Sequence, residues 1–314
     1  VGLELNTLSI IPIISKQHHP RSTEATTKYF LTQAAASAML LFASTLNAWH
    51  AGTWDISQLT HQPACIMLTV ALSMKLGLAP LHFWLPEVLQ GTSLSTALII
   101  TTWQKLAPLA LMFLTHNSLN PAVLMMMGLL STLVGGWGGL NQTQTRKIMA
   151  FSSIAHLGWM TAVMTLAPNL ALLNLTLYLL MTTTTFIMLM FTSSKTITDL
   201  TTASTLSPPI TALMMTLLMS LGGLPPLTGF MPKWLILQEL TNHNFPATAT
   251  IMAISALLSL FFYLRLTYSS TLTSFPATTN TPHKWRLPPK TPTSLMCTML
   301  MLSTLLLPIT PILL

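Results

Sequence analysis

The chain has 314 residues, of which 51% are hydrophobic and only 6% are charged, and its mean hydropathy is +0.63. Soluble domains carry about 25% charged residues, so this composition excludes a water-soluble globular protein. It also excludes a disordered chain, which would be poor in apolar residues. With only two cysteines, Cys65 and Cys297, a disulfide-rich secreted scaffold is excluded as well. The remaining class is an integral membrane protein.

Long apolar runs follow one another along the chain, separated by polar, proline-rich or charged connectors. The runs exceed 15 residues and lack alternation, which favours helices over strands. Helices also satisfy their backbone polar groups internally, as hydrocarbon requires. The chain opens at Val1 inside an apolar run, so we expect a leading span to precede it. We predict an all-α polytopic membrane protein with about ten transmembrane helices, over residues 1–15, 28–49, 63–79, 92–114, 119–140, 148–167, 170–193, 207–231, 246–268 and 293–314.

The connectors differ in charge. Alternate connectors, beginning with 16–27, hold nearly all of the connector lysines and arginines, including Lys284, Arg286 and Lys290 of the last one, whereas the others hold only Asp55 and Glu239. By the positive-inside rule, the first set faces the positive-inside compartment. The net charge of +7 does not indicate nucleic-acid binding, because the basic residues are spread over many apolar segments and form no basic face.

A segment rich in glycine and proline occurs twice. Gly77-Leu-Ala-Pro-Leu-His-Phe-Trp-Leu-Pro-Glu87 recurs 146 residues later as Gly223-Leu-Pro-Pro-Leu-Thr-Gly-Phe-Met-Pro-Lys233, with five of eleven positions identical. The copies lie five predicted spans apart, so they would have opposite orientations across the membrane. Helices broken by glycine and proline in inverted repeats are typical of transporters; ordinary proline-rich connectors are the alternative. We predict one transmembrane domain over 1–314, with inverted repeats over about 1–140 and 148–268 and a C-terminal helix over 293–314.

Lys105 lies near the middle of the predicted span 92–114, about ten residues from either end. That separation is about 15 Å of helix axis, too far for a lysine side chain to extend easily to either interface. A charge at this depth costs about 2.5–3.5 kcal/mol on insertion scales, and burial favours the neutral amine. A lysine held near neutrality can both accept and release a proton. The alternative is a static ion pair that joins two helices.

Four other polar residues fall within or beside predicted spans. Glu4 and Lys75 have no opposite charge within one turn of their own helices, so each is expected to find a partner on another helix, and the two are a plausible pair. Lys233 follows the second proline break, where anchoring at the interface is the alternative role. His156 can relay a proton between lysines, because histidine titrates near neutral pH, or it can be a hydrogen-bonded structural residue.

Motifs for soluble cofactor chemistry do not occur in the sequence. It has no glycine-rich dinucleotide motif and no phosphate-binding loop motif. Its two cysteines stand 232 residues apart and cannot by themselves hold an iron–sulfur cluster, which needs about four ligands. No histidine pair has metal-ligand spacing on one helix. We therefore expect no redox centre, cofactor or metal in this chain.

Three stretches, Lys75–Thr92, Asn141–Met160 and Ser220–Trp234, resemble the antiporter-like membrane subunits of respiratory complex I. The resemblance covers essentially the whole chain in order, including Val1-Gly-Leu-Glu4. It implies two inverted five-helix bundles, each with a broken helix. The membrane-embedded Glu–Lys pair of the family corresponds to Glu4 and Lys75, its central lysine to Lys105 and its distal lysine to Lys233. His156 corresponds to a polar position on the proton path between lysines.

The same resemblance implies a function and a location. We expect a proton-translocating core subunit that couples NADH:ubiquinone electron transfer to proton pumping in the mitochondrial inner membrane. NAD, FMN, ubiquinone and the iron–sulfur clusters would belong to other parts of the complex. The implied partners are neighbouring membrane-arm subunits and membrane lipids, with no nucleic acid. The low charge and frequent methionine and threonine fit a vertebrate mitochondrial product, and the resemblance also implies one further span before Val1.

Two other functions remain as alternatives. A structural subunit could transmit conformational change without carrying protons; substitution of Lys75 and Lys105 would then leave turnover intact. A stand-alone cation/proton antiporter would exchange ions by itself in liposomes. No aspartate lies within a predicted span, which argues weakly against the antiporter because carboxylates are favoured ligands of hard cations.

Overall fold

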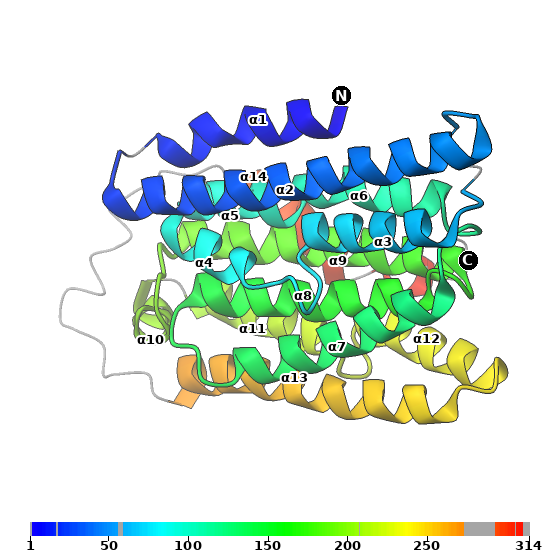
Figure 1. The fold of residues 1–314 in the computed structure, drawn as a ribbon. Coiled ribbons are helices and arrows are strands. Elements are labelled where there is room, and N and C mark those ends of the chain that lie inside the picture. The colour runs from blue at the N-terminus through cyan, green and yellow to red at the C-terminus, as the bar shows by residue number, and fades with distance from the viewer. Residues whose placement is uncertain are drawn as a thin grey trace.

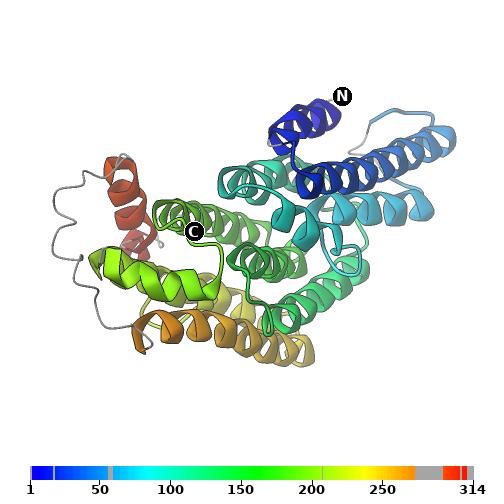
Figure 2. The same ribbon diagram turned by 90° about the vertical axis from the view of Figure 1, so that its left-hand side faces the viewer.

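The computed structural model describes residues 2–16, 18–55, 59–206, 208–272, 293–304 and 306–309. In this part of the chain most of the helices run side by side along a common direction (Figures 1 and 2). It contains no β-strand, only an isolated bridge between Gln144 and Thr196. Lys284, Arg286 and Lys290, and the end of the helix predicted over 293–314, lie outside the described residues.

The helices confirm the predicted all-α membrane fold. Within the described ranges, five stretches are long and apolar enough to cross a membrane: Pro20–Ala51, Leu94–Leu114, Pro121–Gly139, Pro168–Phe191 and Pro246–Ser270. Shorter apolar helices complete the bundle. The elements in chain order are α1 (Gly2–Ser15), α2 (Pro20–Ala51), α3 (Gln62–Leu76), α4 (Trp84–Gly91), α5 (Leu94–Thr101), α6 (Trp103–Leu114), α7 (Pro121–Gly139), α8 (Thr145–Val163), α9 (Pro168–Phe191), α10 (Ile197–Leu206), α11 (Pro208–Gly222), α12 (Phe230–Asn242), α13 (Pro246–Leu272), α14 (Thr293–Thr304) and the 3₁₀ turn η2 (Leu307–Ile309).

Both copies of the Gly–Pro segment interrupt a helix. Residues 77–83 separate α3 from α4, and residues 223–229 separate α11 from α12. Each interruption begins at a glycine with positive φ, +79° at Gly77 and +83° at Gly223, a conformation that glycine adopts without a steric penalty. In Figure 1 the chain passes leftwards from α3 to α4 and rightwards from α11 to α12. The broken helices therefore have opposite orientations, as an inverted repeat requires.

The helix boundaries differ from the predicted ones on the far side of each break. The sequence predicts a connector over 80–91 and another beginning at 232, but α4 and α12 occupy most of these residues. The prediction places Pro86 and Pro232 in connectors because proline interrupts helices. Each in fact lies in the first turn of its helix, where a missing N–H removes no helical hydrogen bond. A further discontinuity at Thr102 divides the predicted span 92–114 into α5 and α6.

Helix α8 lies in the middle of the bundle, with nearly all of its residues buried. It packs tightly against α7 because glycines of α7 face alanines of α8. A Cβ atom added at Gly135 would stand 2.7 Å from the backbone nitrogen of Ala155, and one added at Gly128 would stand 2.9 Å from that of Ala162. The glycines of α7 therefore allow a close approach of the two helices, and the backbone of α8 is held firmly in the interior.

Serine and threonine side chains inside the helices bond to their own backbone. Ser153 donates to the carbonyl of Ala150 at 2.7 Å, Thr182 to that of Tyr178 at 2.8 Å, and Ser220 to that of Leu217 at 2.7 Å. This i−3 or i−4 pattern allows hydroxyl side chains to lie in apolar helices without an unbonded proton. These internal bonds explain how membrane-spanning helices can contain so many serine and threonine residues.

Candidate functional site

Four of the five predicted site residues are buried in the described part of the chain, and each comes from a different helix. Lys75 of α3 is 5% exposed, Lys105 of α6 is 2% exposed, His156 of α8 is 6% exposed and Lys233 of α12 is 8% exposed. Buried amines and imidazoles in a membrane bundle generally mark ion or proton pathways. Their origin on separate helices means that only the folded bundle assembles them.

The Lys105 amine lies beside the ring of Tyr178 on α9. Its Nζ donates to the Tyr178 hydroxyl oxygen over 3.5 Å and stands 5.4 Å from the ring centroid. Tyr178 is itself fully buried. Lys105 makes no salt bridge within the described residues, so the static ion pair considered from the sequence has no counterpart there.

The discontinuity between α5 and α6 provides a second partner for Tyr178. The backbone N–H of Lys105 bonds to the carbonyl of Thr102, at 3.3 Å. The carbonyl of Thr101 accepts instead from the Tyr178 hydroxyl, at 3.2 Å. Tyr178 thus joins Lys105 to the point where the helix is broken, and it satisfies a carbonyl that a continuous helix would have occupied.

His156 lies next to the same tyrosine. The two ring centroids are 5.4 Å apart with an interplanar angle of 40°. Because Tyr178 is also the hydrogen-bond partner of Lys105, His156 and Lys105 lie on either side of one buried ring. The relay role of His156 stays a prediction.

Lys233 binds the end of the broken helix α11. Its amine donates to the carbonyl of Gly222 at 2.8 Å and to that of Leu221 at 3.3 Å. These carbonyls lack helical partners because α11 ends at Gly222. A cation at this end is also favoured by the negative end of the helix dipole. Lys233 is therefore buried and bonded inside the bundle, which does not fit the alternative role of anchoring at the interface.

At the first break, between α3 and α4, an uncharged group bonds to a carbonyl at the helix end instead. The indole nitrogen of Trp84 donates to the carbonyl of Met74 at 3.0 Å. Lys75, in the last turn of α3, has a buried amine with no hydrogen-bond partner among the described residues. The two breaks are alike in backbone but differ in which group satisfies the freed carbonyls, and only the second uses a titratable one.

Glu4 and Lys75 line the same cavity, of about 260 Å³, between α1, α2, α3 and α6. Among the described residues, however, no ion pair within 4.0 Å joins them, and Glu4 is exposed on α1. The structure therefore brings the predicted pair to one cavity without a direct contact.

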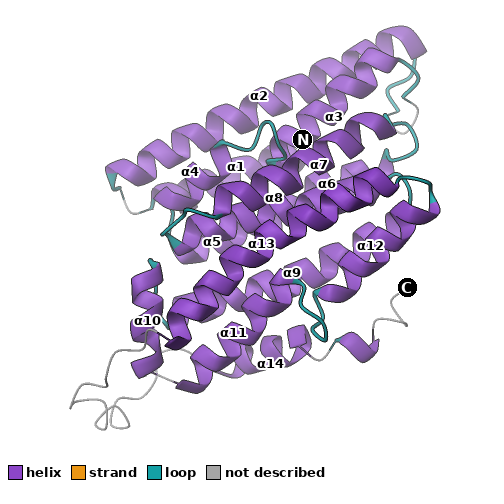
Figure 3. Cartoon of the chain, turned by 90° about the horizontal axis from the view of Figure 1, so that it is seen from below, coloured by secondary structure: helices purple, strands orange, loops and turns teal. Residues whose placement is uncertain are grey.

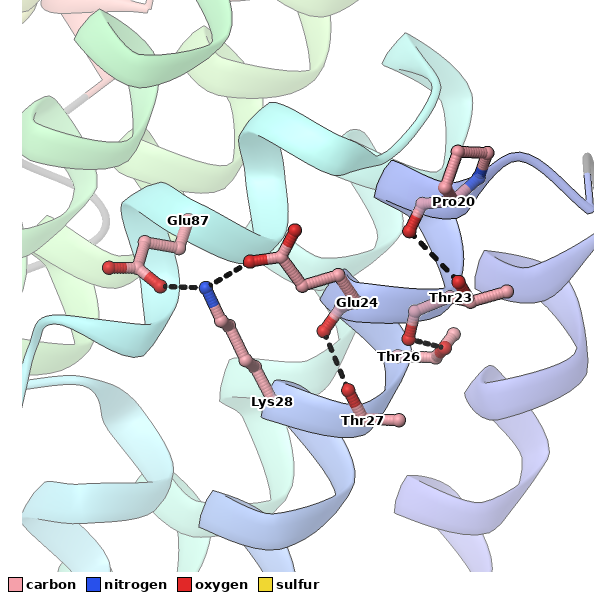
Figure 4. Close-up of polar contacts among 7 residues, drawn as sticks. All are labelled: Pro20, Thr23, Glu24, Thr26, Thr27, Lys28 and Glu87. Carbon is pink, nitrogen blue, oxygen red and sulfur yellow. Dashed lines mark hydrogen bonds and ion pairs between the residues drawn. The ribbon is translucent and has the colours of Figure 1, made fainter.

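Exposed charges collect at one end of the bundle. Lys28 of α2 lies between two carboxylates, Glu24 at 2.6 Å and Glu87 of α4 at 2.7 Å (Figure 4). Figure 3, the view from below, shows α4 and α10 toward the same end of the bundle. These pairs are solvent-accessible, so they fix side-chain positions more than they stabilise the fold. They lie apart from the buried lysines and indicate where the spans end.

Tyr178 is the residue that sequence reasoning missed. It occurs once in an apolar, threonine-rich run and belongs to no motif. Its contacts to Lys105 and to Thr101 bridge 73 and 77 residues of sequence. Only the packing of α9 against α5 and α6 identifies it, and the sequence carries no signal that could have done so.

Comparisons with known proteins agree with this architecture. Residues 1–259 match the family described as "NADH:quinone oxidoreductase/Mrp antiporter, TM", and residues 260–314 match the family "NADH dehydrogenase subunit 2 C-terminus". The chain is 58% identical to NADH-ubiquinone oxidoreductase chain 2 of Xenopus laevis over 99% of its length and 90% of that protein. It is 59% identical to the chain 2 of Varanus timorensis, with the same coverage of each chain.

Solved structures show the same fold. A chain of respiratory complex I from Thermus thermophilus, in a structure with bound aureothin, superposes with a TM-score of 0.81 at 25% identity, over 98% of this chain and 71% of that one. A chain of the Mrp complex from a Dietzia species superposes with a TM-score of 0.79 at 18% identity, over 94% of this chain and 66% of that one. The second likeness shows the fold alone.

Proposed function

The chain belongs to the family of NADH–ubiquinone oxidoreductase chain 2, and from this premise we propose that its buried lysines form a proton path. It is a multi-pass subunit of the mitochondrial inner membrane and acts within multi-subunit complex I. That complex is the enzyme, a proton-translocating NADH:ubiquinone reductase.

The proposed path runs from Glu4 and Lys75 through Lys105 and His156 to Lys233. Its main support is the burial of Lys75, Lys105, His156 and Lys233 in one bundle, with His156 beside Tyr178, the hydrogen-bond partner of Lys105. A buried amine can exchange protons because burial and neighbouring charges set the balance between its two forms. Where these groups do not touch, ordered water must bridge them, since proton transfer requires hydrogen-bond contact.

The path works as a sequence of charge shifts. Redox energy released in other subunits moves Glu4 relative to Lys75 within their shared cavity. When the carboxylate moves away, the charged form of Lys75 loses its stabilisation, and the proton leaves its amine for Lys105. The proton then passes by way of His156 to Lys233. At each step one N–H bond breaks and another forms, so the number of charges in the interior stays constant.

The redox groups of the complex lie outside this chain in the proposed arrangement. We assign no redox group to this chain; NAD, FMN, iron–sulfur clusters and ubiquinone are held elsewhere in the complex. Its partners are the adjacent membrane-arm subunits and lipids. The inverted repeats extend over about 1–140 and 148–268, with a C-terminal helix from 293. The described pair of breaks supports this division.

Replacing Lys105 with methionine in the assembled complex tests the path. Methionine fills the volume but carries no proton, so we expect fewer protons pumped per electron pair, measured in proteoliposomes during NADH oxidation. Lys195→Met is the matched control, because Lys195 is exposed near α10 and outside the interior. An unchanged proton-to-electron ratio in Lys105→Met would reject Lys105 as a carrier.

The same experiment separates the alternative functions. A structural subunit predicts that Lys75→Met and Lys105→Met both leave pumping and turnover intact. A stand-alone antiporter predicts cation-dependent proton exchange by the purified chain in liposomes without the other subunits. We expect neither result, and in particular no exchange by the isolated chain.

A further inference from the structure

The interior contains one hydroxyl whose contacts the proposed path leaves unexplained. Tyr178 is fully buried on α9 and lies between Lys105 and His156, two successive members of that path. A buried tyrosine needs only one hydrogen-bond partner. Here the hydroxyl has the Lys105 amine on one side and the Thr101 carbonyl on the other.

We propose that the Tyr178 hydroxyl relays the proton between Lys105 and His156, and that its bond to the Thr101 carbonyl holds this relay closed. The inference rests on the proposed function, since it adds a carrier to the same path. A tyrosine hydroxyl has one proton to donate and two lone pairs to accept with. It can therefore receive a proton from one neighbour while giving its own to another.

The transfer balances without ionising the tyrosine. An N–H bond of the Lys105 ammonium breaks and a bond forms between that proton and the Tyr178 oxygen. In the same step the original O–H bond breaks, and its proton moves to a ring nitrogen of His156, directly or through one water. Lys105 becomes neutral, His156 becomes charged and Tyr178 ends with one proton, as it began.

The observed geometry corresponds to the closed position. The hydroxyl donates its only proton to the Thr101 carbonyl, at 3.2 Å. A peptide carbonyl is an acceptor with no proton to pass on, so a proton received from Lys105 has no exit. Rotation about the Cζ–O bond toward His156 opens the relay. This carbonyl is free because the helix is interrupted between α5 and α6. The relay therefore assigns a function to the discontinuity at Thr102.

Lys105 is held where the relay needs it. Its amine has the Tyr178 hydroxyl as its one hydrogen-bond partner in the described residues, and the ring face beside it at 5.4 Å favours the charged form by a cation–π interaction. The hydroxyl and the ring thus have separable effects, and removal of the hydroxyl alone tests the relay.

The test compares Tyr178→Phe with Tyr263→Phe and Lys105→Met in assembled complex I. Tyr263 of α13 is a matched control, because it is equally buried but its hydroxyl bonds to none of the path residues within the described chain. Loss of a positioned proton-transfer group slows transfer by about 10²–10⁴-fold. We expect Tyr178→Phe to lower the proton-to-electron ratio as far as Lys105→Met does, and Tyr263→Phe to leave it unchanged.

The outcomes distinguish the relay from the path itself. If Lys105→Met lowers the ratio and Tyr178→Phe does not, the relay is wrong and the path stands; if neither lowers it, the path is wrong. A merely structural role of the hydroxyl would leave the solvent deuterium isotope effect on pumping unchanged, whereas a relay alters it. Should Tyr178→Phe fail to assemble, water positions in the unmodified complex decide. A continuous file of ordered waters from Lys105 to His156 that bypasses Tyr178 would overturn the relay. If the Tyr178 hydroxyl is the only hydrogen-bonded connection between the two residues, the relay is supported.

Discussion

Complex I that carries Gly135→Val in this chain should fail to accumulate in the membrane. Even a single Cβ atom at this position stands 2.7 Å from the backbone nitrogen of Ala155 and 3.0 Å from its Cα. Overpacking of a close-packed interior costs about 1–3 kcal/mol when side chains can adjust. Here the obstacle is backbone, so α7 and α8 must separate. Because α8 carries His156 next to Ala155, the separation also displaces the path.

The measurement is the amount of assembled complex on a native gel, relative to a control on the same helix. Met126→Val serves as that control, because Met126 of α7 is 59% exposed on the outer surface of this chain. It introduces the same side chain without a backbone neighbour. Normal assembly with Gly135→Val would show that α7 and α8 are less closely packed than described.

Lys233→Met should weaken both the fold and proton pumping, whereas Lys233→Arg should affect pumping alone. Methionine leaves the carbonyls of Leu221 and Gly222 without their donor, and an unsatisfied buried acceptor costs about 1–3 kcal/mol. Arginine keeps a positive charge and several donors at the end of α11, but it does not release its proton in proteins. The pair therefore separates the two tasks of one residue.

Two measurements follow each variant: the thermal stability of the purified complex and its proton-to-electron ratio in proteoliposomes. Lys233→Met is expected to lower both values, and Lys233→Arg is expected to lower the ratio at nearly unchanged stability. Full pumping by Lys233→Arg would contradict the view that Lys233 carries protons, and it would leave the residue with only its bonds to α11.

The sequence predicts most of the helical architecture because the relevant signals are local. Apolar runs mark the spans, and the two Gly–Pro copies mark the broken helices with opposite orientations. It does not predict how far helices continue beyond the breaks. Pro86 and Pro232 look like terminators in sequence, yet they lie in the first turn of α4 and α12. The discontinuity at Thr102 has no glycine or proline to signal it and depends on tertiary contacts.

The sequence likewise identifies some residues of the candidate site but not their partners. A charged residue in an apolar run is conspicuous, so Lys75, Lys105 and Lys233 are found from sequence. Their partners are not, because each partner belongs to another helix. The Lys233 amine bonds to two backbone carbonyls and Lys105 to a tyrosine, contacts that residue type cannot reveal. Whether Glu4 reaches Lys75 is likewise a matter of how α1 packs.

The self-bonded serines and threonines of the interior have a consequence for which ions it admits. Each of these hydroxyls has already committed its proton to a carbonyl of its own helix, as Ser153 and Ser220 do. What such a hydroxyl offers to the space around it is oxygen lone pairs. Wherever such hydroxyls border water on the proposed path, they would stabilise hydronium and disfavour chloride or hydroxide. On that proposal, hydroxyl residues of ordinary helices would contribute to a preference for cations without a ring of acidic side chains.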